Sequence, residues 1–138
     1  MSCWTILPLK RRCPDVLKKL LLIDDEPSLT EILSQFLLRL GYSSDTAPSG
    51  NAAVELAAKN QYWAVFCDLK MPGMNGLELF EKIRDLRSDQ TRRFVLFTGS
   101  ILDAESESLV ARNRIMVCRK PFNFESIKET LRSLERVS

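Results

Sequence analysis

The chain has 138 residues, of which 45% are hydrophobic and 28% charged, a balance typical of one folded domain rather than a disordered chain. No apolar run approaches the roughly 18–20 residues of a membrane-spanning helix, and the first residues lack the pattern of a secretory signal. The net charge of +2 does not indicate nucleic-acid binding, because residues 1–19 alone contribute about +4 and leave the remainder slightly acidic. We therefore expect a cytoplasmic protein that neither enters a membrane nor binds nucleic acid directly.

Histidine is absent from the sequence, which excludes several kinds of chemistry. Ser-His-Asp and Cys-His catalysis, histidine metal sites and any phosphohistidine on this chain all need that residue. If a phosphoryl group passes through this chain, its donor histidine belongs to another molecule. The four cysteines have no CxxC or zinc-like spacing, and Cys67 and Cys118 lie in apolar runs where a thiol acts as a small hydrophobe.

In chain order, the first predicted strand is the apolar run at residues 20–23, which ends on the acidic sequence DDEP at residues 24–27. Apolar residues at helical spacing then predict a helix up to residue 40, with the proline suited to its first turn. A short polar segment at residues 43–47 is expected to form an edge strand, and the alanine-rich residues 50–60 a helix.

Three further apolar runs alternate with helical patterns over the rest of the chain. The run WAVFC ends on Asp68, and the loop sequence MPGMNG after it is rich in glycine, proline and asparagine. The run FVLF leads into Thr98, and IMVC leads into Arg119 and Lys120. The strands are expected at residues 63–67, 94–97 and 115–118, with helices around residues 77–83, over 103–113 and after the N-cap residue Asn123.

Five strands that alternate with five helices predict a doubly wound α/β fold, in which a parallel sheet carries helices on both faces. The continuous apolar strands support this prediction, because strands of such sheets are buried on both sides. Neither an internal repeat nor a second domain is indicated. We expect one domain over residues 19–138, preceded by a basic leader or linker over residues 1–18 that is expected to be disordered.

Polar residues follow the ends of the predicted apolar strands. Asp24 and Asp25 follow the first strand, Asp68 the third, Thr98 the fourth and Lys120 the last. If the strand order is 2-1-3-4-5, the first and third strands are neighbours, and the three carboxylates converge where such sheets bind ligands. Oxygen ligands alone suit a hard cation such as Mg²⁺, and the acid after the third strand becomes a candidate nucleophile for phosphoryl transfer.

Each of these residues also has an ordinary interpretation. Acids before a helix, such as Asp24 and Asp25, more often cap the helix than bind a metal, and Asp68 alone would be a common turn residue. Thr98 and Lys120 carry almost no information individually. Their joint placement at four strand ends favours a phosphorylatable metal site over these separate explanations.

Four segments, LLLIDDEP, VFCDLKMPGMNG, VLFTGS and CRKPF, resemble in their order and spacing the response-regulator receiver domain of two-component signalling. The resemblance covers about residues 19–138. It implies a flavodoxin-like fold and a signalling module that accepts a phosphoryl group from a histidine kinase or a histidine phosphotransfer protein. Such a module is no enzyme beyond its own Mg²⁺-dependent phosphorylation and dephosphorylation.

The resemblance also implies a role for the residues that handle the phosphoryl group. Asp68 is the expected phospho-acceptor, Thr98 the expected switch hydroxyl, and Lys120 the expected ion-pair partner of the phosphoryl group. The peptide bond between Lys120 and Pro121 is expected to be strained and often cis.

The expected Mg²⁺ ligands are likewise implied by the resemblance. Asp25 would bind the ion directly, Asp24 largely through water, and Asp68 and the main-chain carbonyl of Lys70 would be further ligands. Glu26 is expected to be a helix-cap charge rather than a ligand, favoured there by the helix dipole.

The sequence departs from the family at one position of the last strand. Receiver domains usually carry Tyr or Phe three residues before the lysine, where this chain has Val117. A short, branched side chain cannot turn as a large aromatic one does. We therefore expect any change on phosphorylation to stay within residues 98–105 and the helix that they begin.

Three functions are compatible with these residues. A phosphorylation-controlled module is favoured, as a free-standing regulator, a phosphate shuttle or the terminal receiver of a hybrid sensor kinase. The alternative is a receiver-like binding scaffold that signals without phosphate. A phosphohydrolase ranks last, because Lys70 stands where such an enzyme would need a second acid. The partner kinase and a homodimeric state are left open.

Overall fold

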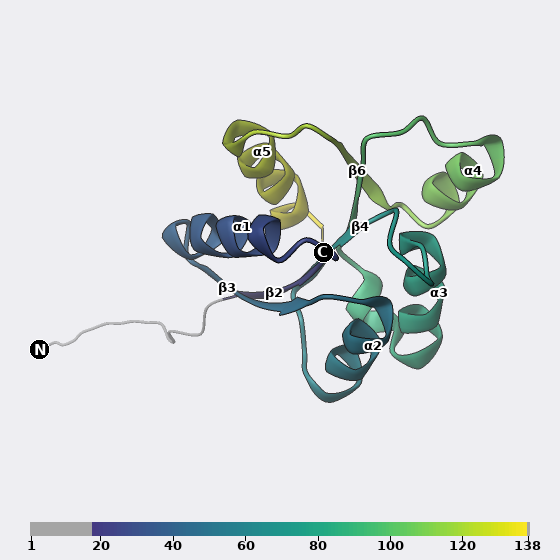
Figure 1. Cartoon of the computed structure of the whole chain (residues 1–138), viewed down its shortest axis with the longest axis horizontal. Coiled ribbons are helices and arrows are strands. Elements are labelled where there is room, and N and C mark those ends of the chain that lie inside the picture. The colour runs from purple at the N-terminus through teal and green to yellow at the C-terminus, as the bar shows by residue number, and fades with distance from the viewer. Residues whose placement is uncertain (1–17, 138) are drawn as a thin grey trace, which may run out of the picture.

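The computed structural model describes residues 18–137, which form a five-stranded sheet with helices on both faces (Figure 1). All neighbouring strands are parallel, in the order β3-β2-β4-β5-β6, so the predicted order 2-1-3-4-5 and the doubly wound fold are confirmed. Apart from Lys18 in the first strand, the leader expected over residues 1–18 lies outside the described residues. The strands are β2 (Lys18–Ile23), β3 (Tyr42–Ala47), β4 (Ala64–Asp68), β5 (Phe94–Thr98) and β6 (Met116–Arg119).

Five α-helices and one short 3₁₀ helix connect the strands of the described part of the chain. Helices α1 and α5 pack on one face of the sheet, and α2, α3 and α4 pack on the other (Figure 1). None of the helices within residues 18–137 combines the length and apolar character that crossing a bilayer requires. The helices are α1 (Pro27–Arg39), α2 (Gly50–Lys59), α3 (Gly76–Leu86), the 3₁₀ helix η1 (Ser88–Thr91), α4 (Ala104–Arg112) and α5 (Phe124–Glu135).

Successive side chains of the apolar strands pack into different cores, because a strand points them alternately to its two faces. In β2, Leu20 and Leu22 pack with residues of α1 and α5, whereas Leu21 and Ile23 pack with residues of α2 and α3. None of these four side chains is more than 2% exposed. The alternation fixes the strand register, since a shift by one residue would exchange the two cores.

Asparagine caps begin two helices that follow loops at the carboxyl edge of the sheet. Asn75 accepts hydrogen bonds from the main-chain N–H groups of Leu77 and Glu78 at the start of α3. Asn123 accepts one from Ser126 at the start of α5, as the sequence predicts. Such caps satisfy main-chain donors that have no partner inside the helix, and so they set where each loop ends.

Candidate functional site at the carboxyl edge of the sheet

The strand ends bring polar side chains together at one edge of the sheet. Asp24 follows β2 directly, Asp68 and Thr98 are the last residues of β4 and β5, and Lys120 follows β6. Because β2 and β4 are adjacent parallel strands, their carboxyl ends meet where the strand order reverses. Main-chain hydrogen bonds continue past the strands, from Asp24 N–H to Ala47 O at 3.2 Å and from Lys120 N–H to Thr98 O at 2.8 Å.

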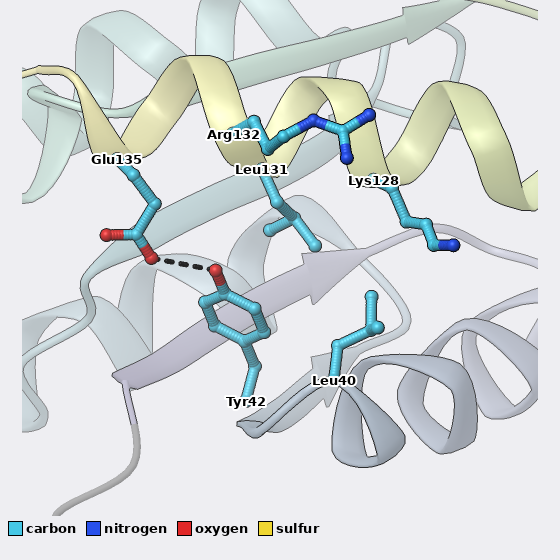
Figure 2. A pocket seen from close by; sticks show the side chains of 6 residues that line it. All are labelled: Leu40, Tyr42, Lys128, Leu131, Arg132 and Glu135. Carbon is cyan, nitrogen blue, oxygen red and sulfur yellow. Dashed lines mark hydrogen bonds between the residues drawn. The ribbon is translucent and has the colours of Figure 1, made fainter.

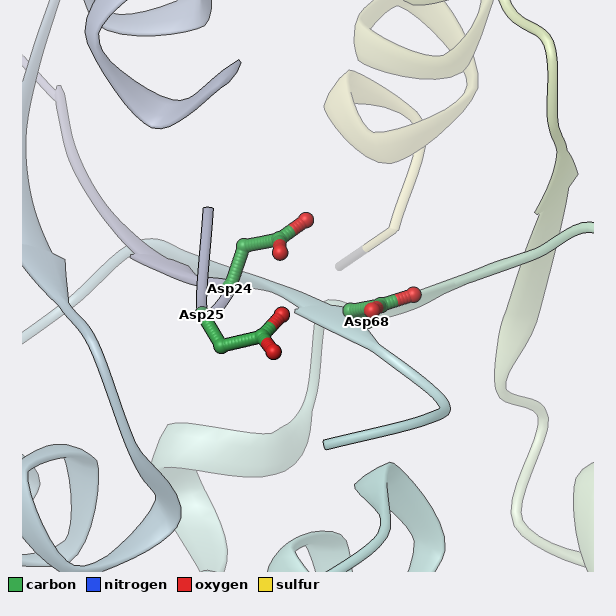
Figure 3. A group of neighbouring side chains, drawn as sticks. All are labelled: Asp24, Asp25 and Asp68. Atoms are coloured by element: carbon green, nitrogen blue, oxygen red, sulfur yellow. The ribbon is translucent and has the colours of Figure 1, made fainter. Parts of the chain in front are cut away.

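Asp24, Asp25 and Asp68 form a compact carboxylate cluster (Figure 3). One carboxylate oxygen of each residue lies within 4.8 Å of the other two. Asp24 and Asp68 are only 5% and 8% exposed, whereas Asp25 is exposed to solvent. The structure therefore brings the three predicted acids together.

The two acids after β2 do not act as caps of α1. Glu26 occupies the N-cap position of this helix, and no side chain makes a capping hydrogen bond there. Asp24 instead accepts a hydrogen bond from the main-chain N–H of Glu26 at 3.0 Å. The ordinary interpretation of this acidic pair as helix caps is thus not supported by the geometry.

Lys120 provides a cation beside two acids of the carboxylate cluster. Its Nζ lies 3.1 Å from Asp68 Oδ1 and 3.7 Å from Asp24 Oδ2. Burial alone would lower the pKa of Lys120, but the hydrogen bond and charge of Asp68, with the charge of Asp24, raise it on balance. Burial raises the pKa of Asp24, and the negative charge of Asp68 raises it further. The main-chain hydrogen bond from Glu26 lowers this pKa but does not cancel the rise. The peptide bond between Lys120 and Pro121 is cis, as expected.

The Thr98 hydroxyl is turned toward the loop that follows β5. Thr98 is 2% exposed, and its Oγ1 accepts a hydrogen bond from Ser100 N–H at 3.0 Å and donates one to Ser100 O at 3.3 Å. Its hydrogen-bond partners therefore lie in the loop and not in the carboxylate cluster. Lys70 is exposed two residues after Asp68, and the role of its main-chain carbonyl as a metal ligand stays a prediction.

Two residues at this edge were not identified from the sequence. A Cβ atom at Gly76 would lie 2.8 Å from the main-chain oxygen of Asp68, so only glycine fits this approach of α3 to β4. Arg119 donates a hydrogen bond from Nη1 to Ser100 O at 2.9 Å. The glycine could have been suspected from its loop motif, but no local pattern indicates the reach of the arginine.

The chemistry of the carboxylate cluster suits a hard divalent cation. Its donors are three carboxylates, and the nearby Cys67 is fully buried, with its thiol donating to the main-chain oxygen of Asp68 at 3.2 Å. Mg²⁺ accepts a few carboxylates and retains waters, and the exposure of Asp25 leaves one side of the cluster open to solvent. The residues present therefore fit the predicted Mg²⁺.

A second surface hollow, between α1, β3 and α5, lacks comparable chemistry (Figure 2). Its acid Glu135 accepts a hydrogen bond from the Tyr42 hydroxyl at 2.7 Å and forms an ion pair with Lys18. Burial, with the hydrogen bond to Glu135, raises the pKa of Tyr42 to about 12. Because these groups satisfy one another, we assign function to the carboxyl edge of the sheet. The hollow is lined by Leu40, Tyr42, Lys128, Leu131, Arg132 and Glu135.

An aspartate beside a lysine and two further acids, at the switch point of a doubly wound sheet, is the arrangement of α/β domains that take a phosphoryl group onto a carboxylate. Comparison with known proteins shows which family of such domains this chain belongs to. The sequence profile described as "Response regulator receiver domain" matches residues 20–132. The chain belongs to this family, and it is a phosphorylation-controlled module of two-component signalling.

Similar proteins differ in how much of their length this chain spans. It is 27% identical over 118 residues to sporulation initiation phosphotransferase F of Bacillus subtilis, covering 83% of this chain and 91% of that protein. It is 31% identical over 112 residues to the sensor histidine kinase RcsC of Escherichia coli, covering 81% of this chain but 12% of the kinase. It is 28% identical over 118 residues to the transcriptional regulatory protein TcrA of Mycobacterium tuberculosis, covering 86% of this chain but only 46% of that protein.

Solved structures show the same fold. The response regulator TrrA of Thermotoga maritima, in complex with Mg²⁺-BeF, is 33% identical with a TM-score of 0.72, covering 86% of this chain and 99% of that one. The chemotaxis response regulator CheY4 of Vibrio cholerae is 27% identical with a TM-score of 0.75. The match covers 86% of this chain and 99% of that one. The flavodoxin-like receiver fold implied by the sequence is therefore confirmed.

Proposed function

We propose that Asp68 accepts a phosphoryl group from a phosphohistidine of a separate protein, and that Mg²⁺ is bound beside it. The observation that carries this proposal is the position of the Asp68 carboxylate. It is largely buried, lies 3.1 Å from Lys120 Nζ and shares a cluster with Asp24 and Asp25. This environment supplies positive charge and metal ligands around one reactive oxygen.

In the proposed transfer, a carboxylate oxygen of Asp68 forms a bond to phosphorus as the bond from phosphorus to the donor nitrogen breaks. The electron pair stays on the donor imidazole, which then takes a proton from water. Mg²⁺ held by Asp24, Asp25, Asp68 and the Lys70 carbonyl would offset negative charge on the transferring oxygens. The Lys120 ammonium stabilises the same charge and pairs with the phosphoryl group afterward, when the Thr98 hydroxyl can turn to donate to it.

The donor is proposed to be a histidine kinase or a histidine phosphotransfer protein, as the receiver family implies, and its phosphohistidine must lie on that partner because this chain has no histidine. The similarity to both a short phosphotransferase and part of a long sensor kinase is compatible with a free-standing regulator or a hybrid-kinase receiver. We expect the chain to act in the cytoplasm and to catalyse only its own phosphorylation and dephosphorylation. Self-association into a homodimer stays an open prediction.

The proposal is tested by incubating the chain with a small phosphodonor and Mg²⁺ and measuring intact mass. The wild type should gain one phosphoryl group and Asp68→Asn none. Asp85→Asn, in an exposed turn of α3, is a matched control that should label like the wild type. Equal labelling of Asp68→Asn would overturn the assignment, and no labelling of the wild type would favour the phosphate-independent scaffold.

A further inference from the structure

The last strand touches the loop after β5 through a side chain that the receiver chemistry does not use. Arg119, the final residue of β6, lies beside Thr98 in the strand register. Its guanidinium extends past the strand end, and Nη1 donates a hydrogen bond to Ser100 O at 2.9 Å. Among the described residues of β6, Arg119 is the one whose side chain makes a hydrogen bond to residues 99–103.

The same carbonyl also accepts the proton of the switch hydroxyl. Thr98 Oγ1 donates to Ser100 O at 3.3 Å and accepts from Ser100 N–H at 3.0 Å. A hydroxyl has a single proton to donate, so Thr98 must release Ser100 O before it can donate to a phosphoryl oxygen. A further hydrogen bond that fixes the Ser100 carbonyl in this position therefore favours the rotamer in which the Thr98 hydroxyl faces the loop.

Arg119 holds that carbonyl more strongly than the threonine does. Its contact is shorter, at 2.9 Å against 3.3 Å, and a hydrogen bond with a charged donor is stronger than a neutral one. Val117, two residues earlier on β6, is half-buried and has no polar group with which to contact the loop. The polar side-chain link between β6 and the loop thus runs through the arginine.

We infer that Arg119 is a positioning residue that acts through Ser100 on Thr98, and this inference rests on the proposed phosphorylation of Asp68. Arg119 anchors the loop in the arrangement in which Thr98 hydrogen-bonds Ser100, and opposes the turn of the Thr98 hydroxyl toward the phosphoryl group. When that turn takes place, the position of the Ser100 carbonyl changes, and the hydrogen bond from the guanidinium passes this change to the end of β6. Val117 cannot couple the loop to β6 in this way, because its side chain is small and apolar.

The test compares wild type with Arg119→Met, which keeps the apolar stem and removes the donors. The probe is beryllofluoride with Mg²⁺, a mimic of the phosphoryl group, titrated while amide shifts are recorded. Arg119→Met should bind the mimic roughly two- to tenfold more tightly, because one exposed hydrogen bond no longer opposes the change. Its amide shifts at residues 116–119 on binding should be smaller than those of the wild type.

Three controls separate positioning from a general structural effect. Arg92→Met removes an exposed arginine just before β5, at the opposite edge of the sheet, and should bind the mimic like the wild type. Arg119→Lys retains a donor and should lie between the wild type and Arg119→Met. Affinity for Mg²⁺ alone should be the same in all of these, since Arg119 contacts none of the carboxylates.

The outcomes distinguish this inference from the function on which it rests. Unchanged or weaker binding of the mimic by Arg119→Met, with normal binding by the wild type, would overturn the role of Arg119 and leave phosphorylation of Asp68 intact. Failure of the wild type to bind the mimic would overturn both. Asp68→Asn should abolish binding whichever residue stands at position 119.

Discussion

Replacing Asp25 by asparagine should stabilise the metal-free protein, because it relieves repulsion within the carboxylate cluster. Each pair of carboxylate oxygens lies within 4.8 Å, where two charges repel by about 0.9 kcal/mol at the dielectric of water. Asp25 takes part in two such pairs, with Asp24 and with Asp68. It is exposed, and Lys120 forms its ion pairs with the other two acids. After a discount for the nearby ammonium, we expect a net gain of about 1 kcal/mol.

The assay is thermal unfolding with and without Mg²⁺. Without the metal, Asp25→Asn should melt about 3–6 °C higher than the wild type, given the size of the domain. Mg²⁺ at ten times its dissociation constant should stabilise the wild type by about 1.4 kcal/mol, because it binds only the folded state. The variant should lose most of that increase, so that the order of the two melting temperatures reverses as Mg²⁺ is added.

A matched control separates the cluster from the general effect of removing a negative charge. Glu31→Gln changes the net charge by the same amount at an exposed position on α1. It should keep the full Mg²⁺-dependent increase and gain little stability without the metal. If Asp25→Asn melts below the wild type without Mg²⁺, or keeps the full increase, the reasoning from charge repulsion and shared metal binding is refuted.

Two other substitutions test the packing beneath the site and the ion pair at the opposite edge of the sheet. Gly76→Ala should cost about 1–3 kcal/mol in chemical denaturation, because its Cβ would meet the main-chain oxygen of Asp68 at 2.8 Å. Gly50→Ala, where the Cβ meets a flexible methionine side chain, should cost less, and equal losses would contradict this argument. Burial would raise the pKa of Glu135, but hydrogen bonds from Lys18 and a tyrosine hold it below its ordinary 4.5. The ionised group therefore stabilises the fold above that pH, and Glu135→Gln should lose up to about 1 kcal/mol at neutral pH. The difference should shrink as the pH falls below 4.5 and through the lowered pKa, and a difference that does not change with pH would contradict the assignment.

The strands and long helices could be predicted because their sequence patterns reflect local geometry. A run such as residues 20–23 is apolar throughout because both faces of its strand are buried. The 3₁₀ helix η1 could not be predicted in the same way. Gln90 in this helix is 1% exposed, and its amide accepts from Tyr62 N–H at 2.8 Å and donates to Ala57 O at 2.8 Å. A polar residue buried by partners about 30 positions away leaves no periodic signal in its own segment.

The site was predictable to the level of which residues meet, but not to the level of how their side chains are turned. The acids and Lys120 converge because parallel strand ends meet at one edge, and that follows from strand order alone. The rotation of the Thr98 hydroxyl toward Ser100 depends on the conformation of the loop. The Arg119 contact depends on strand register together with the length of its side chain.

The Arg119 contact changes what we predict from Val117 alone. The sequence indicates that a change at Thr98 stays within residues 98–105, because a short β-branched residue cannot follow the hydroxyl inward. That prediction concerns coupling through apolar side-chain packing against β6. The hydrogen bond from Arg119 to Ser100 O adds a polar contact that couples the loop to the end of the strand. With both features present, amide shifts on binding of a phosphoryl mimic should extend to Cys118 and Arg119 but fade before α5. Large shifts along the length of α5 would show that another contact carries the change.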